Sequence, residues 1–167
     1  MSVENILSNS SLPKHTLSRR LSLVLLAISL LLVACGESQV NQCNRLIDVI
    51  DDGHALMQDF DKQTPRSTAQ LSQDLDKLVE KLKAVKLSDQ KLQSYRDRYA
   101  QIYSKLSDSF STTSSALASA QQAPDNQSGI EQVQKAKKQV EKASQQAEKA
   151  AKRADAIAAE MNAYCHP

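Results

Sequence analysis

The longest hydrophobic repeat of the chain runs through residues 133–164, VQKAKKQVEKASQQAEKAAKRADAIAAEMNAY. Its apolar and small residues follow one another at alternating steps of three and four: Val133, Ala136, Val140, Ala143, Ala147, Ala150, Ala154, Ile157, Met161 and Tyr164. This spacing places them along one face of an α-helix, as in the seam by which helices pack in coiled coils. Because half of these ten residues are alanine, the helix must approach its neighbour closely to gain contacts.

Three earlier segments show the same kind of spacing. The first carries Cys43, Leu46, Ile50, Gly53, Met57 and Phe60; the second carries Leu71, Leu75, Leu78, Leu82 and Val85; the third carries Leu92, Tyr95, Tyr99, Ile102, Leu106, Phe110, Thr113, Leu117 and Ala120. With the breaks between them, we expect helices at about 40–62, 67–86, 89–122 and 129–164. Four helices joined by short connections predict an all-α fold, an up-down-up-down four-helix bundle.

The expected helix starts rest on polar residues before each segment. Ser67 with Gln70, and Ser128 with Glu131, match the capping-box pattern, and Ser88 is the expected N-cap of the third helix. At ~1.5 Å per residue, the third and fourth helices overhang the shorter ones by roughly 15 Å or more. The far end is therefore either a two-helix arm or a region that the first helix and the 63–66 loop help to cover.

An uncharged, mostly apolar run precedes these segments and ends at Cys35. The 14 residues of this run, 21–34, are too few to cross a bilayer core of about 30 Å, which needs roughly 20 helical residues. The run suits the apolar region of a signal peptide, with its positive flank supplied by Lys14, Arg19 and Arg20. The alternatives are a short uncleaved anchor and an ordinary cleaved signal, although residues 33–35 lack the small-residue pattern of ordinary cleavage.

The tetrad Leu32-Val33-Ala34-Cys35 at the end of this run resembles the lipobox of bacterial lipoproteins. The resemblance implies that the signal peptide, residues 1–34, is removed and that Cys35, carrying acyl chains such as palmitate, becomes the first residue of the mature chain. Residues 35–39 then form a lipidated tether, and residues 40–167 form the helical bundle domain. It also implies a lipid-anchored protein of a bacterial cell membrane that faces the periplasm or the cell exterior.

The charge of the mature chain is balanced. The whole chain has 21 Lys and Arg and 19 Asp and Glu; residues 1–34 hold three of the former and one of the latter, which leaves 18 of each. A nucleic-acid-binding surface needs a basic face. The sequence therefore predicts no nucleic-acid partner.

Two cysteines remain once Cys35 is acylated: Cys43 and Cys165, near opposite ends of the mature chain. An exported chain meets an oxidising compartment, where an even pair usually closes, and an up-down-up-down bundle brings both residues to the same pole. We therefore expect a disulfide between Cys43 and Cys165 that joins the first and last helices; two free thiols or an intermolecular bridge are the alternatives. In the chain-entropy model, closing so long a loop raises the free energy of unfolding by ~4–5 kcal/mol.

An aromatic stripe in the third segment is a candidate binding surface. Tyr95, Tyr99 and Tyr103 recur at helical spacing. This pattern indicates either core packing, with the hydroxyls at the rim, or a binding groove opposite the alanine-rich helix.

The first segment is acidic, and Asp48 or Asp51 with His54 is a conceivable divalent-metal site. It lacks the calcium-loop motif and a second histidine at helical spacing, so we expect a solvated face and no metal site. Cys43, Cys165 and His166 are a poor ligand set for zinc. No arrangement typical of a nucleophilic enzyme occurs, so we expect no catalytic residues and no cofactor.

These observations favour a membrane-anchored lipoprotein whose exported bundle is a binding or scaffolding module for a protein partner in the cell envelope. One alternative is a small-ligand or metal sensor with its site inside the bundle. Another is a structural envelope stalk similar to the small murein-linked lipoprotein, a single long helix that ends in a lysine. The chain ends instead in Cys-His-Pro and has breaks at Pro65 and Pro124, which argue against the stalk.

Overall fold

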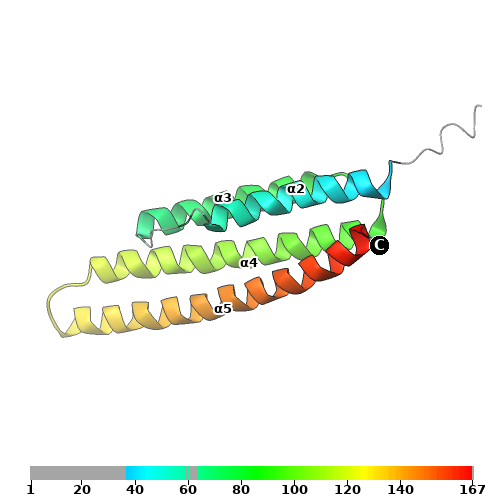
Figure 1. Cartoon of the computed structure of the whole chain (residues 1–167). Coiled ribbons are helices and arrows are strands. Elements are labelled where there is room, and N and C mark those ends of the chain that lie inside the picture. The colour runs from blue at the N-terminus through cyan, green and yellow to red at the C-terminus, as the bar shows by residue number, and fades with distance from the viewer. Residues whose placement is uncertain (1–36, 59, 61–63, 167) are drawn as a thin grey trace, which may run out of the picture. The chain divides into compact units, whose positions relative to one another are not determined.

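The computed structural model describes residues 37–58, 60 and 64–166, and this part of the chain forms four α-helices and no strands. The helices are α2 (Gln39–Gln58), α3 (Pro65–Ala84), α4 (Gln90–Gln121) and α5 (Gln127–Cys165), shown in Figure 1. They belong to one compact unit, Glu37–Pro167. The expected signal peptide and Cys35 lie outside the described residues. None of the described helices combines the length and the apolar character that a membrane crossing requires.

The up-down-up-down four-helix bundle predicted from the hydrophobic spacing is confirmed. Each helix packs against the next one in the chain, and α2 also contacts α4 and α5. The described helix ends differ from the expected ones by one to four residues. The core is built from the predicted seams, and its most deeply buried side chains are Tyr99, Leu46, Leu75, Leu82, Leu92, Thr68 and Cys43.

Helix α3 begins earlier than the capping pattern predicted. Thr64 is the N-cap, and its hydroxyl accepts a hydrogen bond of 3.1 Å from the Ser67 backbone N–H. The Ser67 hydroxyl in turn accepts one of 3.0 Å from the Thr64 backbone N–H. Ser67 is therefore the third residue of the helix and not its cap. Pro65 explains the shift, because its fixed φ and missing N–H suit the first helical position.

The N-caps of α4 and α5 also differ from the prediction by one or two residues. Asp89, not Ser88, caps α4, and its carboxylate accepts hydrogen bonds from Lys91 N and Leu92 N. Asn126, not Ser128, caps α5 by accepting a hydrogen bond of 3.1 Å from the Gly129 N–H. Asp and Asn cap helices at least as well as serine, so sequence alone did not separate the neighbouring candidates.

One pole of the bundle is closed by contacts between all of its helix ends. The predicted disulfide joins Cys43 of α2 to Cys165 of α5. Beside it, the buried Gln42 side-chain oxygen accepts hydrogen bonds from Ser88 N at 2.7 Å and Asp89 N at 3.0 Å, in the connection between α3 and α4. The Tyr164 hydroxyl of α5 donates to the Asp89 carboxylate at 2.7 Å. Together, these bonds link α2, α5 and the connection between α3 and α4 at one pole of the bundle.

In the middle of the bundle, a glycine lets α2 approach the tyrosines of α4. The Tyr103 hydroxyl donates a hydrogen bond of 3.0 Å to Ile50 O on α2. A Cβ at Gly53 would lie 2.7 Å from Leu78 Cδ2 and closer still to the Tyr103 hydroxyl, both well inside van der Waals contact. Gly53 therefore permits a close helix crossing.

The far ends of α4 and α5 form the two-helix arm that was one of the two expectations for the overhang. Figure 1 shows these helices continuing past the ends of α2 and α3. Their contact surface is lined by the buried alanines Ala116 and Ala136. Val133, expected in the seam, is instead 45% exposed. Among the described helices, only α4 can cover it at this level, because α3 begins at Pro65, whose carbonyl accepts a hydrogen bond from Ser114 of α4.

Replacement of Gly53 by alanine tests the close crossing. Alanine favours a helix interior by about 1 kcal/mol over glycine, but overpacking a core costs roughly 1–3 kcal/mol. We expect Gly53→Ala to lower the free energy of unfolding by about 1 kcal/mol, as measured by urea denaturation followed by circular dichroism.

The matched control is His54→Ala, because His54 is exposed on the same turn; it should change stability by less than about 0.5 kcal/mol. A Gly53→Ala chain that is as stable as the wild type, or more stable, would contradict the close crossing.

Candidate functional site

The three tyrosines of the predicted stripe lie in the core. Tyr95, Tyr99 and Tyr103 are 2%, 0% and 2% exposed, so they line no surface groove. The Tyr99 hydroxyl donates a hydrogen bond of 3.3 Å to Ala154 O on α5, and the Tyr103 hydroxyl bonds to α2 as described above. Burial raises the pKa of Tyr99 to about 12 and raises that of Tyr103 as well. The structure therefore gives these side chains a packing role.

The acidic residues of α2 lie on an exposed face. Asp48, Asp51 and His54 are exposed, and the Asp51 carboxylate lies 3.8 Å from His54 Nδ1. Asp52 pairs with Lys81 of α3. Within the described part of the chain, no group of three or more His, Cys, Asp or Glu side chains could hold a metal ion. Of the cysteines, Cys43 and Cys165 are bonded to each other, and the candidate lipidation residue Cys35 lies outside the described residues.

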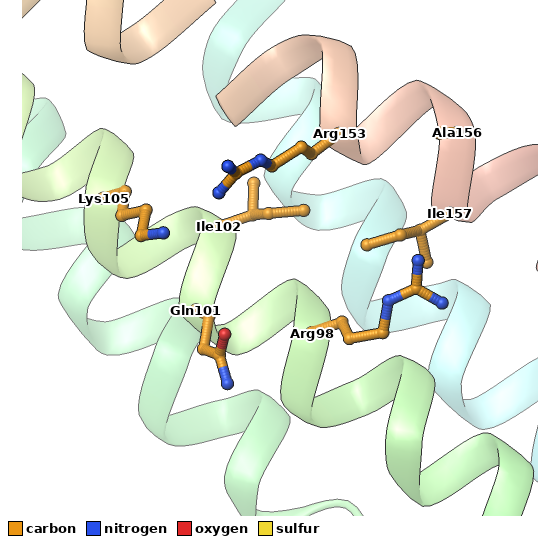
Figure 2. Close-up of a pocket in the computed structure, with 7 residues that line it drawn as sticks. All are labelled: Arg98, Gln101, Ile102, Lys105, Arg153, Ala156 and Ile157. Atoms are coloured by element: carbon orange, nitrogen blue, oxygen red, sulfur yellow. The ribbon is translucent and has the colours of Figure 1, made fainter. Parts of the chain in front are cut away.

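A groove between α4 and α5 is the candidate site that the sequence did not reveal. It has a volume of about 280 Å³ and is lined by Arg98, Gln101, Ile102, Lys105, Arg153, Ala156 and Ile157 (Figure 2). Ile102 and Ile157 belong to the buried core and form its apolar floor. Figure 2 shows the ends of Lys105 and Arg153 pointing toward the same space, with Ile102 beside the Arg153 side chain. The groove thus combines an apolar floor with a cationic rim.

The three cations of the groove differ in how they are neutralised. Arg98 forms a bidentate pair with Glu160 of α5, with N–O distances of 2.7 and 3.3 Å, and this pairing raises the pKa of Arg98. The side chains of Lys105 and Arg153 have no ion-pair or hydrogen-bond partner among the described residues. Two positive charges from different helices therefore face the groove without a counter-charge from the described chain.

A second hollow, of about 650 Å³, lies along α2 and α3 and differs from the groove in its charge. Two of its cations have carboxylate or carbonyl partners: Arg45 bonds to Glu37 and to Lys86 O, and Lys81 bonds to Asp52. The lining also includes Lys86, Glu37 and Asp48, so it carries charges of both signs, whereas the charged residues that line the groove are all cations. The groove between α4 and α5 is the better candidate for selective binding.

Sequence reasoning missed the groove because its residues come from two distant segments. Lys105 and Arg153 reach the same groove only because α4 and α5 pack antiparallel in one particular register. The Arg98–Glu160 ion pair forms in the same register. A usable signal was present: each cation stands three or four residues from a seam isoleucine, Ile102 or Ile157. Boundary positions of this kind border a helix–helix contact.

The buried phenols predict a loss of stability at alkaline pH. Folded Tyr99 holds its proton up to about pH 12, whereas the unfolded chain releases it near pH 10. Because the folded state has the higher pKa, its contribution to stability is complete below pH 10 and is lost as the pH rises toward 12. We expect the free energy of unfolding to fall over this range in urea titrations.

The double variant Tyr99→Phe with Tyr103→Phe should show a smaller fall over the same pH range, measured in the same buffers. Lysines and the other tyrosines titrate in both chains and so cancel in the comparison. An identical slope in the wild type and the variant would contradict a role for the buried phenols.

Comparisons with known proteins assign no family to the chain. No protein-family model matches it, and no curated protein or solved structure gives a match.

Proposed function

We propose that the chain is a bacterial lipoprotein whose exported helical bundle is a binding or scaffolding module in the cell envelope. The observation that carries this proposal is the order of a basic flank, an apolar run and Leu32-Val33-Ala34-Cys35. The disulfide between Cys43 and Cys165 supports it, because structural disulfides are typical of exported chains. Acylated Cys35 is the attachment to the lipid bilayer, and a protein of the envelope is the partner.

The proposed anchor places the closed pole next to the lipid. Helix α2 begins at Gln39, four residues after Cys35, and an extended chain covers at most ~3.6 Å per residue. The first residue of α2 can therefore lie at most about 15 Å from the lipidated residue, and Cys43 follows about one helical turn later. Each CH₂ of an acyl chain that is buried in the bilayer adds about 0.8 kcal/mol to the free energy of membrane binding, so two or three chains make the attachment effectively permanent.

The far arm is the part of the bundle best suited to meet a partner. Helix α5 has 39 residues, which corresponds to about 58 Å at ~1.5 Å per residue. Ile130 and Val133, 53% and 45% exposed, lie on the arm beside a hollow that Pro124 also lines. Large apolar side chains exposed together mark interaction surfaces more often than isolated ones. The arm thus offers a contact surface that the lipid anchor holds away from the bilayer.

The two alternatives differ in what supports them. A sensor of small ligands is favoured by the groove between α4 and α5, which is described further below. A structural stalk of the murein-linked type requires one long helix, whereas the described chain folds back on itself into four helices. The binding module therefore remains our first proposal.

Metabolic labelling with a palmitate analogue tests the lipid anchor. We expect the wild-type chain, expressed in a bacterium, to incorporate the label and to fractionate with membranes, because acylation occurs at Cys35. Cys35→Ala should lose both the label and the membrane association.

The matched control is the double variant Cys43→Ser with Cys165→Ser, which removes the other two cysteines and should keep the label. Equal labelling of the wild-type and Cys35→Ala chains would contradict the anchor.

A further inference from the structure

We propose that the groove between α4 and α5 binds a phosphomonoester group, held by Lys105 and Arg153. No feature of the proposed anchor or of the arm requires this site. The two cations come from different helices, Lys105 from α4 and Arg153 from α5, and neither has an ion-pair partner among the described residues.

Ion pairs join neighbouring helices at two levels of the described chain: Asp52 of α2 meets Lys81 of α3, and Arg98 of α4 meets Glu160 of α5. Only about two turns from the Arg98–Glu160 pair, Lys105 and Arg153 place two positive charges at the same groove. Like charges that are brought close together repel each other. A bound anion would remove this repulsion.

The two cations favour a phosphomonoester over a carboxylate. A phosphomonoester carries about −1.5 to −2 charges at pH 7 and has three acceptor oxygens. A carboxylate carries one charge and would leave one of the two cations unneutralised. The guanidinium of Arg153 presents a planar fork of donors, and the ammonium of Lys105 acts as a compact point charge. Together they suit a dianionic group that is approached from two helices.

The size and the floor of the groove define the rest of the ligand. Its volume of about 280 Å³ lies just below the roughly 300–1,000 Å³ of pockets for drug-sized ligands. Ile102 and Ile157 offer an apolar surface beneath the cations, and the Gln101 amide at the rim can both donate and accept. We infer a small body with few polar groups attached to the phosphoryl group, such as glycerol phosphate or the head of phosphatidic acid.

Isothermal titration calorimetry of the full chain in nonionic detergent tests the site. Glycerol phosphate should bind at a single saturable site, whereas glycerol should not bind. Arg153→Gln and Lys105→Gln should each weaken binding by about tenfold or more, because each removes a charge-assisted contact. Lys138→Gln is the matched control: Lys138 is an exposed α5 lysine that does not line the groove, and this variant should bind like the wild type.

Phosphatidic acid mixed into the micelles distinguishes the two sources of the phosphoryl group. If it blocks the binding of glycerol phosphate, a lipid occupies the groove; if it does not, the ligand is soluble, and either result supports the site. The Cys35→Ala chain should bind equally well, which separates this proposal from the anchor. Absence of saturable binding, or equal affinity in Arg153→Gln and Lys105→Gln, would overturn the proposal.

Discussion

The covalent bond between the first and the last helix is the constraint on which the rest of the bundle depends. Cys43 and Cys165 are separated by 122 residues in sequence, and the chain brings them to the same pole by reversing direction between successive helices. In the chain-entropy model, a loop of this size contributes roughly 4–5 kcal/mol by restricting the unfolded state. Gln42 and Tyr164, each next to one of the two cysteines, bond to the connection between α3 and α4 and so bring the middle helices to the same pole.

Away from that pole, the size of the side chains determines how closely the helices pack. Gly53 admits the Tyr103 ring between α2 and α4. Ser72 and Ser107 exchange hydrogen bonds of 3.0 Å with each other's backbone carbonyls, which satisfies buried hydroxyls where α3 and α4 meet. Along α5 half of the seam residues are alanine, and this allows α4 and α5 to continue as a pair beyond the core. The same close pairing brings cations from both helices to one groove.

Much of the fold could be predicted from the sequence because hydrophobic spacing is a local signal. The 3-4 repeats predicted four helices, and the even number of remaining cysteines predicted their connection. Helix starts were less accurate, since Thr64, Asp89 and Asn126 compete with neighbouring polar residues that cap equally well. The exposure of Val133 and the charges at the α4–α5 groove depend on which helices overlap and in what register, and no local pattern encodes this. The proposed lipidation of Cys35, by contrast, rests on the sequence alone.

Mass mapping of the unreduced chain, exported and purified without thiols, tests directly whether a disulfide joins the first and last helices. If Cys43 and Cys165 are bonded, proteolysis releases the peptides containing residues 43 and 165 as one linked species, which separates into two after reduction. If the two peptides are recovered separately from unreduced material, or are each linked to a second chain, the first and last helices are not joined in this way and the account is contradicted.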